Sequence, residues 1–362
     1  MSTPLLRLVV LYGGVSAEHD VSRVTAAHVL AAADTEKYVL VPVGIDKNGT
    51  WHRNDAAAAA LAAGEELPNS LPVEGPEVDP LSVIRDAQRV EGPGQLTVVL
   101  PLLHGPHGED GTVQGMLELF KVPYVGCGVL SSALCMDKAM AKEVAARAGI
   151  PQCDWLTFRD GVDDARTVVS EAVDRLGLPV FVKPANMGSS VGVTRATTRE
   201  ELDEAINVAL HYDDVVVIEE AVVGREIEVG VLGNAAPDTT LPGEIKPGSD
   251  FYDYEDKYVT GNAELMIPAL LSDEAIAQVR ELAADAFVAL RCAGMARVDF
   301  FYEEDGRGWL LNEINTIPGF TPASMYPKMW EASGIAYPDL IDRLVTLALD
   351  VHRRRSSFST EH

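Results

Sequence analysis

The feature that most constrains the fold of this chain is an alternation of short, β-branched apolar runs with helical patterns. The first apolar run covers residues 6–10; it leads to a Gly-Gly pair, and an alanine-rich helical pattern follows over residues 16–33. Further strands are predicted over residues 38–45 and 95–103. Strands that alternate with helices indicate an α/β unit with a mostly parallel sheet.

The length of the chain predicts more than one packed unit. At 362 residues it exceeds what one ordinary hydrophobic core accommodates, which indicates two or three units. In chain order the prediction is an α/β unit over residues 1–126 with an inserted surface excursion over residues 53–94, a central unit over residues 127–224, a C-terminal unit over residues 225–352, and a frayed, solvated tail over residues 353–362.

Within this frame the later elements are also predicted from their patterns. Helices are expected over residues 136–148 and 338–352, and strands over residues 179–183 and 215–219. The excursion is rich in Ala, Pro, Gly and Glu with little periodicity, and beyond a short helix over its alanines we assign it no function.

Charge and composition exclude several classes of partner. The chain has 29 Lys and Arg residues against 55 Asp and Glu, for a formal net charge of −26. Because phosphates would be repelled, nucleic acid and anionic membrane surfaces are not expected partners. A site for a polyanion must then be locally basic, which makes the few lysines informative.

The four cysteines and the apolar runs predict the compartment. No CxxC pair or ligand-like spacing occurs, so neither a zinc site nor a disulfide framework is indicated. No run approaches the roughly 20 apolar residues of a membrane span. We therefore expect a cytoplasmic protein in a reducing environment.

The most informative segment is a hairpin pattern over residues 296–315. Two β-rich runs flank an acidic turn that contains glycine, which is typical of a hairpin. If the hairpin is symmetric about Gly306, Asp299 faces Glu313 and Arg297 faces Asn315. Because strand side chains alternate, all four would then lie on one face.

Opposed carboxylates in such a hairpin indicate a divalent cation. Side chains directly opposite each other have Cβ atoms about 5 Å apart, and two like charges there are destabilising. Mg²⁺ removes the repulsion, and its shell usually combines one or two carboxylates with substrate phosphates. The alternative is a solvated sheet face with ordinary surface acids, and a register slip of one residue would remove the site.

A second segment, residues 180–193, has the composition of an anion site. A strand delivers Lys183, and a Gly/Ser loop that includes Gly188 and Ser189 follows. Backbone amides and hydroxyls of such a loop can cradle a phosphate. By itself the pattern favours an ordinary hairpin loop. Lys138 at the head of a helix is equally ambiguous, because an exposed lysine is the usual case.

Other candidate residues have plain structural alternatives. A strand that runs into Glu219 and Glu220 can bind a ribose or an adenine, or can simply end there. Glu18 in the first turn of a helix complements the helix dipole, or faces a cleft and grips a substrate ammonium. His104 ends a strand, where α/β folds place ligands, or is a turn residue without chemistry.

Two further segments complete the set. Residues 251–258 are aromatic and charged, and such a loop can close over a site and exclude water. Residues 317–324 offer a glycine amide and a serine hydroxyl just beyond the hairpin.

These motifs together resemble one family. The chain contains, in this order, GGVSAEHDVS, LLHGPHGEDGT, FVKPANMGSSVGV, EEAVVGREIE, FYDYEDKY, ARVDFF and NEINTIPGFTPAS. The set is similar to the D-alanine–D-alanine ligases of the ATP-grasp fold, and the resemblance spans the chain apart from residues 53–94 and the tail. It implies an N-terminal α/β parallel-sheet domain and two α+β domains that sandwich ATP.

The resemblance implies roles for residues of each motif. Lys138 and Lys183 would contact ATP phosphates, Glu226 the ribose, and the backbone of residues 219–222 the adenine. Two Mg²⁺ ions, with Mn²⁺ as an alternative, would be held by Asp299, Glu313 and Asn315. The implied ATP-binding set is Lys138, Lys183, Glu219, Glu220, Ala221, Val222 and Glu226.

The remaining roles concern the two D-alanines. Glu18 would bind the first ammonium, with His104 near its methyl and carboxylate, and Ser189 and Tyr258 would join Glu18 in a set that orders the closing loop. Arg297 and the amide of Gly319 would face the oxyanion. Lys257 and Ser324 would receive the second carboxylate.

The resemblance implies ATP-dependent synthesis of D-alanyl-D-alanine for peptidoglycan, through an acyl phosphate, by a homodimer. One alternative exchanges the second D-alanine for D-lactate or another amino acid. The other is a nucleotide-binding sensor without catalysis, against which the set Arg297, Asp299, Glu313 and Asn315 speaks.

Overall fold

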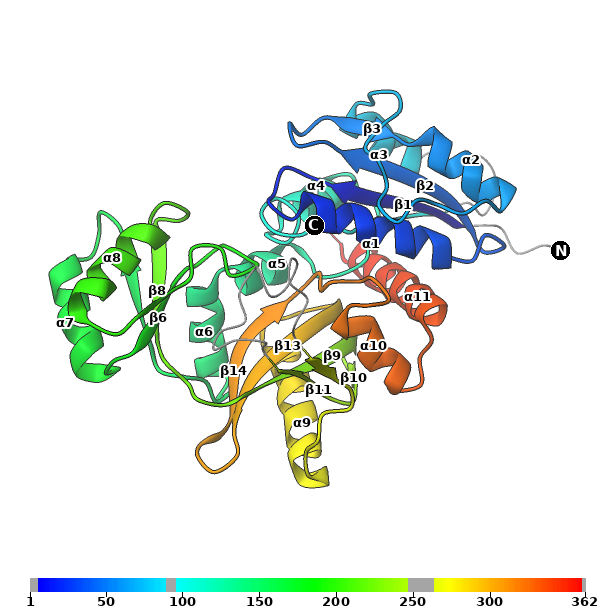
Figure 1. Ribbon diagram of the computed structural model, residues 1–362. Coiled ribbons are helices and arrows are strands. Elements are labelled where there is room, and N and C mark those ends of the chain that lie inside the picture. Colours follow the sequence, from blue (N-terminus) through cyan, green and yellow to red (C-terminus); the bar gives the residue numbers. More distant parts are fainter. Residues whose placement is uncertain (1–5, 89–95, 247–263, 360–362) are drawn as a thin grey trace.

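The computed structural model describes residues 6–88, 96–246 and 264–359, with the side chains of residues 85–88 left out of the description. Within these residues the strands form three sheets, each with its own helices (Figure 1). The sheets follow one another along the chain, with the first over residues 6–101, the second over residues 155–220 and the third over residues 225–315. The domain limits at residues 126 and 224 stay a prediction.

The first sheet has the order β3-β2-β1-β4. Its central strand β1 (Leu6–Gly13) pairs in parallel with β2 (Tyr38–Ile45) and with β4 (Thr97–Pro101), while the short β3 (Trp51–Arg53) adds an antiparallel edge. The helix α1 (His19–Ala32) connects β1 to β2, as parallel neighbours require. The mostly parallel sheet expected from the alternating pattern is thus confirmed.

The turn after β1 depends on a glycine. Gly13 has φ +88°, and a Cβ there would lie 2.2 Å from the carbonyl oxygen of Ile45. Only glycine tolerates both the conformation and the close approach. The amide of Gly14 donates to the same carbonyl at 2.8 Å, so the chain turns tightly at the end of β2 and starts α1 beside it.

The described part of the excursion, residues 53–88, packs on the first sheet. It contains α2 (Asp55–Ala63) and α3 (Pro80–Gln88), and Leu71 between them is fully buried. The buried Asn54 caps α2 by accepting from the amide of Ala57 at 2.9 Å, and its Nδ2 donates to the hydroxyl of Tyr12 at 3.0 Å. The excursion therefore contributes Ala57, Leu71 and Ile84 to the buried clusters, while most of its other described residues are exposed or half-buried, as expected of a surface segment.

The second sheet is antiparallel, in the order β5-β8-β6-β7. Its strands are β5 (Trp155–Arg159), β6 (Val180–Pro184), β7 (Thr194–Ala196) and β8 (Val215–Glu220). The helices α7 (Ala165–Arg175) and α8 (Arg199–Ala209) bury their apolar faces against it, and they form the outer edge of this lobe in Figure 1.

The third sheet has the order β12-β11-β9-β13-β14, with β10 paired to β9, and all its pairs are antiparallel. Its strands are β9 (Arg225–Gly233), β10 (Asp238–Thr239), β11 (Gly243–Lys246), β12 (Glu264–Met266), β13 (Gly294–Glu303) and β14 (Gly308–Asn315). The helix α9 (Asp273–Ala289) shares its buried core.

Three further helices lie between the sheets. In the first unit α4 (Thr112–Leu119) follows β4. The helices α5 (Val129–Met136) and α6 (Lys138–Arg147) bury Cys135 and Ala145 in the core of the third sheet, although Ala139 packs against the second. The helix α6 therefore contacts buried residues of both the second and the third sheet.

The C-terminal helices join the third sheet to the first. The helices α10 (Met325–Ala332) and α11 (Tyr337–Ser356) follow β14. Leu340 and Leu344 of α11 belong to the same buried cluster as Leu8 of β1 and Met295 of β13. Figure 1 shows α11 beneath the first sheet and beside α10.

The structure corrects the predicted tail from residue 353 on in one respect: its first residues are helical, although they are exposed as predicted. The helix α11 continues through Ser356, so residues 353–356 are not frayed. The guanidinium of Arg355 contacts the carboxylate of Glu118 and donates to the hydroxyl of Tyr124 at 3.1 Å. This anchor in the first unit holds the last helical turn in place, which a string of three arginines alone did not indicate.

No helix in the described part of the chain combines the length and hydrophobicity that a membrane span requires.

Leu344→Ala should destabilise the protein by about 2 to 5 kcal/mol, because it opens a cavity where α11 meets the first sheet. Urea unfolding followed by circular dichroism measures the change. The matched control is Leu119→Ala, whose side chain is 84% exposed and should change stability by no more than about 0.5 kcal/mol. Equal effects of the two substitutions would contradict the role given to α11.

Candidate active site

The register of the β13–β14 hairpin places the expected residues opposite each other. Arg297 pairs with Asn315 and Asp299 with Glu313, as the symmetry about Gly306 predicts. The sequence analysis did not foresee a register shift between Asp299 and Phe300. Phe300 pairs with Leu311, so Asn312 is the extra residue of a bulge, and Asn312 and Glu313 both line the cleft described below.

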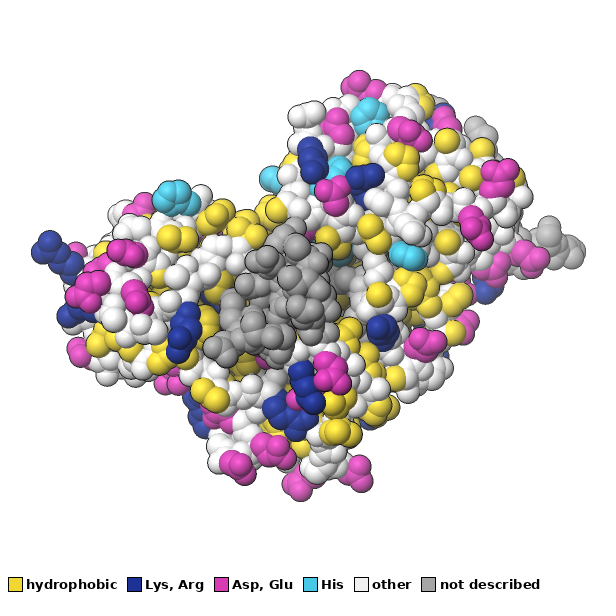
Figure 2. All heavy atoms as spheres, in the orientation of Figure 1, with side chains coloured by type: hydrophobic (Ala, Val, Ile, Leu, Met, Phe, Trp, Pro, Cys, Tyr) yellow, Lys and Arg dark blue, Asp and Glu magenta, His cyan; other side chains and the backbone are white. Residues whose placement is uncertain are grey.

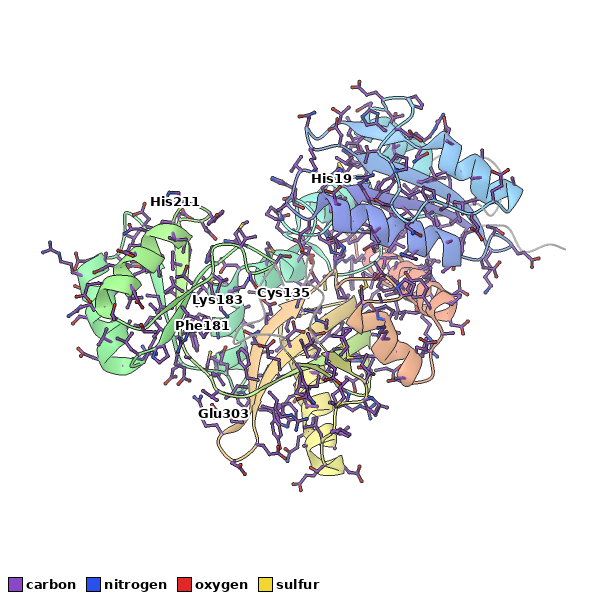
Figure 3. All side chains as sticks on the ribbon, viewed as in Figure 1. His19, Cys135, Phe181, Lys183, His211 and Glu303 are labelled. Carbon is purple, nitrogen blue, oxygen red and sulfur yellow. The ribbon has the colours of Figure 1, made fainter. Side chains whose placement is uncertain are left out.

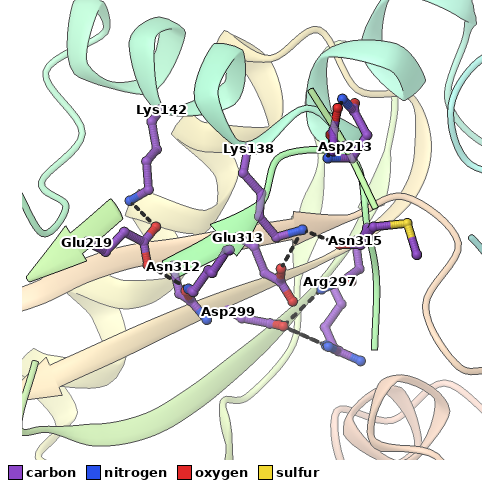
Figure 4. Close-up of polar contacts among 12 residues, drawn as sticks. Lys138, Lys142, Asp213, Glu219, Arg297, Asp299, Asn312, Glu313 and Asn315 are labelled. Carbon is purple, nitrogen blue, oxygen red and sulfur yellow. Dashed lines mark hydrogen bonds and ion pairs between the residues drawn. The ribbon is translucent and has the colours of Figure 1, made fainter. Parts of the chain in front are cut away.

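Arg297 holds Asp299 from beside it on the same strand. Its Nε donates to Oδ1 of Asp299 at 2.8 Å and its Nη2 to Oδ2 at 2.7 Å, while Asn315 donates to the same Oδ2 at 2.9 Å. The buried Glu228 lies 3.1 Å from Nε of Arg297. Burial alone would lower the pKa of Arg297, but Asp299 and Glu228 outweigh it and raise the pKa well above its usual value. Figure 4 shows this group with Glu313 and Lys138 beside it.

The donor set of the hairpin suits a hard cation. Asp299 and Glu313 supply carboxylates and Asn315 an amide oxygen, which are the ligands that Mg²⁺ takes in combination with water and phosphate. In the described ranges no group of three His, Cys, Asp or Glu side chains is arranged to enclose a metal. Two carboxylates and one amide would leave the other positions of an octahedral shell to water or phosphate.

Lys138 and Lys183 reach the same region from two elements. Lys138, the first residue of α6, donates to the carbonyl oxygen of Met187 at 2.6 Å and lies 3.7 Å from Oε2 of Glu313. Lys183 on β6 lies 2.6 Å from Oε2 of Glu219 and 3.4 Å from Oδ1 of Asn312. Figure 3 shows Lys183 on the face of the second sheet that is turned toward the centre of the molecule.

The Gly/Ser loop meets the first unit through a hydrogen bond. Ser189 donates to Oε1 of Glu18 at 2.6 Å, across 171 positions of sequence. Ser189 and Ser190 have φ of 51° and 59°, a conformation that is uncommon outside glycine. Gly105 has φ +75°, and a Cβ there would lie 2.9 Å from Oε2 of Glu18, so a side chain at this position would displace the carboxylate.

His104 is buried and binds the backbone beyond the hairpin. Its Nδ1 lies 3.0 Å from the carbonyl oxygen of Ile317. Because a carbonyl only accepts, Nδ1 carries the proton and Nε2 is an acceptor in the neutral ring. Among the described residues Nε2 has no hydrogen-bond partner. Burial lowers the pKa of His104, with Glu18 opposing, so the ring is neutral.

Glu109 is a half-buried residue of this site that the sequence analysis missed. Oε2 of Glu109 accepts from the amide of Gly105 at 2.6 Å, and the amide of Ile317 also interacts with this carboxyl. Burial, with Glu18 nearby, raises its pKa to about 8. His104 and Glu109 thus hold the backbone carbonyl and amide of Ile317 from the first unit. An acid in a Gly-rich turn gives no sequence signal of these contacts.

Gly319 lies in the loop that leads to α10, and Ser324 lies immediately before that helix. Oγ of Ser324 is bound within its own loop, accepting from the amide of Thr321 at 3.1 Å and lying 2.8 Å from Oγ1 of Thr321. Ser324 precedes the first residue of α10, and its side chain does not cap the helix. Ser324 and Met325 both line the cleft described below, and the N-terminus of a helix is a favourable position for an anion.

Of the remaining predicted residues, Glu220 and Ala221 make hydrogen bonds of their own, and two others are not described. Glu220 faces away from the hairpin ligands, because its Oε1 accepts from the amide of Asp154 at 2.8 Å and contacts Arg307. The amide of Ala221 is bound to the carbonyl of Pro179 at 3.2 Å, so this amide is already committed within the unit. Lys257 and Tyr258 lie outside the described residues.

One cleft brings most of these side chains together. It encloses about 480 Å³ between the first and third sheets, and the lining includes Glu18, His104, Glu109, Ser189, Glu226, Arg297, Asp299, Glu313, Asn315, Gly319 and Ser324. Lys138, Lys183 and residues 219–222 do not line it. In Figure 2 the outline of the molecule is notched between the lobe with α7 and α8 and the lobe with the first sheet, and acidic side chains are spread over both lobes.

Glu109→Gln should flatten the pH dependence of stability. The folded pKa is above the ordinary value of 4.5, so the stabilisation is complete below about pH 4.5 and is lost as pH rises through about 8. Wild-type stability should fall across this window by on the order of 1 kcal/mol per pH unit relative to the variant. Urea unfolding between about pH 5 and about pH 9 tests this, with exposed Glu331→Gln as the control. Parallel curves for wild type and Glu109→Gln would contradict it.

Comparison with known proteins agrees with this geometry. The family model described as D-ala D-ala ligase N-terminus matches residues 7–127, and the one described as D-ala D-ala ligase C-terminus matches residues 144–346. A D-alanine–D-alanine ligase of Bacillus licheniformis is 45% identical over 354 residues, which cover 96% of this chain and 97% of the relative. One from Acetivibrio thermocellus is 44% identical over 359 residues, with 95% and 96% covered.

Solved structures give the same result. A D-alanine–D-alanine ligase from Coxiella burnetii has a TM-score of 0.80 and 37% identity, and 97% of this chain and 96% of that chain are covered. A D-Ala:D-Ser ligase from Enterococcus faecalis has a TM-score of 0.80 and 34% identity, with 95% and 100% covered. A D-alanine–D-alanine ligase from Bacillus anthracis, complexed with ATP, has a TM-score of 0.74 and 28% identity, with 96% and 99% covered. With two family models and near-complete relatives matching it, the chain belongs to the D-alanine–D-alanine ligase family and has the three-domain ATP-grasp fold.

Proposed function

We propose that this protein joins two D-alanine molecules into D-alanyl-D-alanine for peptidoglycan precursor synthesis, converting ATP to ADP and phosphate. The observation that carries the proposal is the convergence of Glu18, the Arg297–Asp299 pair and the start of α10 in one cleft. The carboxylate can bind the ammonium of an amino acid, and the guanidinium can stabilise charge on a reacting carboxylate. The N-terminus of the helix can bind the carboxylate of a second amino acid.

The first D-alanine is proposed to bind beside Glu18. The carboxylate of Glu18 would receive its ammonium, while the hydrogen bond from Ser189 keeps that carboxylate in place. The neutral ring of His104 suits contact with the methyl group, because it carries no charge to pair with a carboxylate. Tyr258 would complete this set, and its role stays a prediction because it lies outside the described residues.

Phosphoryl transfer is proposed to occur above the hairpin. The carboxylate of the first D-alanine attacks the γ-phosphate, which yields an acyl phosphate and ADP. Lys138 and Lys183 would stabilise the phosphate oxygens, and Glu226 would hold the ribose. Asp299, Glu313 and Asn315 would hold Mg²⁺, which would neutralise negative charge on the transferred group.

The second step forms the peptide bond. The amine of the second D-alanine attacks the acyl carbonyl, and phosphate leaves. Arg297 and the amide of Gly319 both line the cleft and would stabilise the oxyanion. The amides at the start of α10, with Ser324 and Lys257, would bind the second carboxylate.

Asp299→Asn should lower kcat/KM for ADP release by about a hundredfold or more, because it removes a charged ligand from the proposed cation site. A coupled assay with D-alanine, ATP and Mg²⁺ measures this, and L-alanine should support no turnover. Asp305→Asn on the exposed turn of the same hairpin is the control and should retain activity. Full activity of Asp299→Asn, or equal turnover of L-alanine, would favour a different function, including a non-catalytic nucleotide sensor.

A second candidate keeps the first step and changes the nucleophile. The similarity to a solved D-Ala:D-Ser ligase supports D-serine as an alternative second substrate. The sequence analysis named D-lactate as another alternative. Mass spectrometry of products formed with D-alanine, D-serine and D-lactate in equal amounts should show the D-alanine dipeptide in excess. A dominant D-alanyl-D-serine or depsipeptide product would replace the proposed specificity.

We also propose a cytoplasmic homodimer. The four buried cysteines are all free thiols, which supports a reducing compartment. Light scattering should give twice the chain mass of 38.9 kDa, and a monomer mass at micromolar concentration would contradict the homodimer.

A further inference from the structure

The buried carboxylate of Glu219 is paired with two lysines. Nζ of Lys142 lies 3.0 Å from its Oε1, and Nζ of Lys183 lies 2.6 Å from its Oε2. Figure 4 shows Lys142 approaching Glu219 from α6, on the opposite side from the hairpin ligands. Two lysines thus share one buried carboxylate, and Glu313 of the hairpin also acts electrostatically on Lys183.

The two lysines differ in what else they can reach. The Lys142 side chain is 4% exposed, its Nζ lies 3.4 Å from Sγ of Cys153, and it sits over the ring of Trp155 at 5.4 Å from the centroid. The Lys183 side chain is 14% exposed and borders Asn312, which lines the cleft. Only Lys183 is therefore placed to exchange Glu219 for a ligand.

We propose that Lys142 is a positioning residue for nucleotide binding: it is the permanent counter-ion of Glu219, which allows Lys183 to turn from Glu219 to a phosphate. The inference rests on the ATP-binding roles proposed for Glu219 and Lys183. Without Lys142, moving Lys183 to a phosphate would leave a buried carboxylate without a cation. With Lys183 on a phosphate, Lys142 and Glu219 remain together as an ion pair.

The ionisation of Glu219 is consistent with this division. Burial would raise the pKa of Glu219, but Lys142 and then Lys183 outweigh it and lower the pKa to about 2. The carboxylate thus stays charged throughout the physiological range, so it needs a cation whether or not nucleotide is bound.

The helix α6 links the two ends of the proposed nucleotide site. Lys138 and Lys142 are four positions apart and so lie on the same face of the helix. Lys138 reaches Met187 and Glu313 at the phosphate end, while Lys142 reaches Glu219 at the proposed adenine end. This spacing places Lys138 where it can bind the phosphates of the ligand and Lys142 where it binds the carboxylate of Glu219.

Lys142→Met should weaken ADP binding by about tenfold or more, because Lys183 then stays on Glu219. The KM for ATP should rise by a similar factor, while kcat stays within about threefold and the KM for D-alanine is unchanged. A role in packing alone would lower thermal stability without this split between KM and kcat. Lys121→Met, an exposed lysine in the first unit, is the control and should change neither.

A double-mutant cycle with Glu219→Gln isolates the pairing. The amide needs no counter-ion, so adding Lys142→Met to Glu219→Gln should leave ADP affinity within about twofold and should not lower the melting temperature further. This comparison carries the test if Lys142→Met alone does not fold, because the double variant contains neither of these two charges.

Calorimetric titration with ADP and Mg²⁺ distinguishes failure of the proposed function from failure of the role proposed for Lys142. Absence of ADP binding to the wild-type protein would overturn the proposed function. Binding that is equally strong in wild type and Lys142→Met, or a loss from Lys142→Met that is the same in the Glu219→Gln background, would overturn the role of Lys142. A loss confined to the Glu219 background supports it.

Discussion

The register of the β13–β14 hairpin is the constraint on which the rest of the site depends. Val298 and Phe300 point into the core between α9 and the third sheet, which turns Arg297 and Asp299 to the opposite, cleft-facing side. A slip of one residue would exchange these faces and bury the charges in apolar surroundings. The apolar face thus fixes where the charged face lies, and the bulge at Asn312 adds a second consecutive cleft-facing position without disturbing the core beyond it.

Charged side chains in and beside this cleft are paired with opposite charges, in a chain whose overall charge is −26. Arg297 is matched by Asp299 and Glu228, while Glu219 has two lysines. Each of these groups is costly to bury alone and tolerable only with its partners. When one side chain of such a group turns to a charged substrate, the group that it leaves still has a second partner of opposite charge.

The cleft exists because elements far apart in the chain meet around it. The helix α11 packs its apolar face on the first sheet, and His104 and Glu109 hold the peptide of Ile317 just beyond β14. These contacts place the start of α1, with Glu18, over the hairpin. Ser189 then brings the loop of the second sheet to the same carboxylate. Loss of any one contact would change the distance between groups that must react together.

By itself the sequence determined the α/β alternation, the pairing of Asp299 with Glu313, and the family, because periodicity, turn residues and motif order are local properties of the chain. Only the tertiary structure decided that Leu71 joins the core and that Arg355 anchors the end of α11. It also decided that Lys142 is buried beside Glu219 and that Glu109 binds the backbone of Gly105 and Ile317. Burial and ion pairing depend on what approaches from other segments, and a lysine or glutamate looks the same in the sequence whether water or another charge surrounds it.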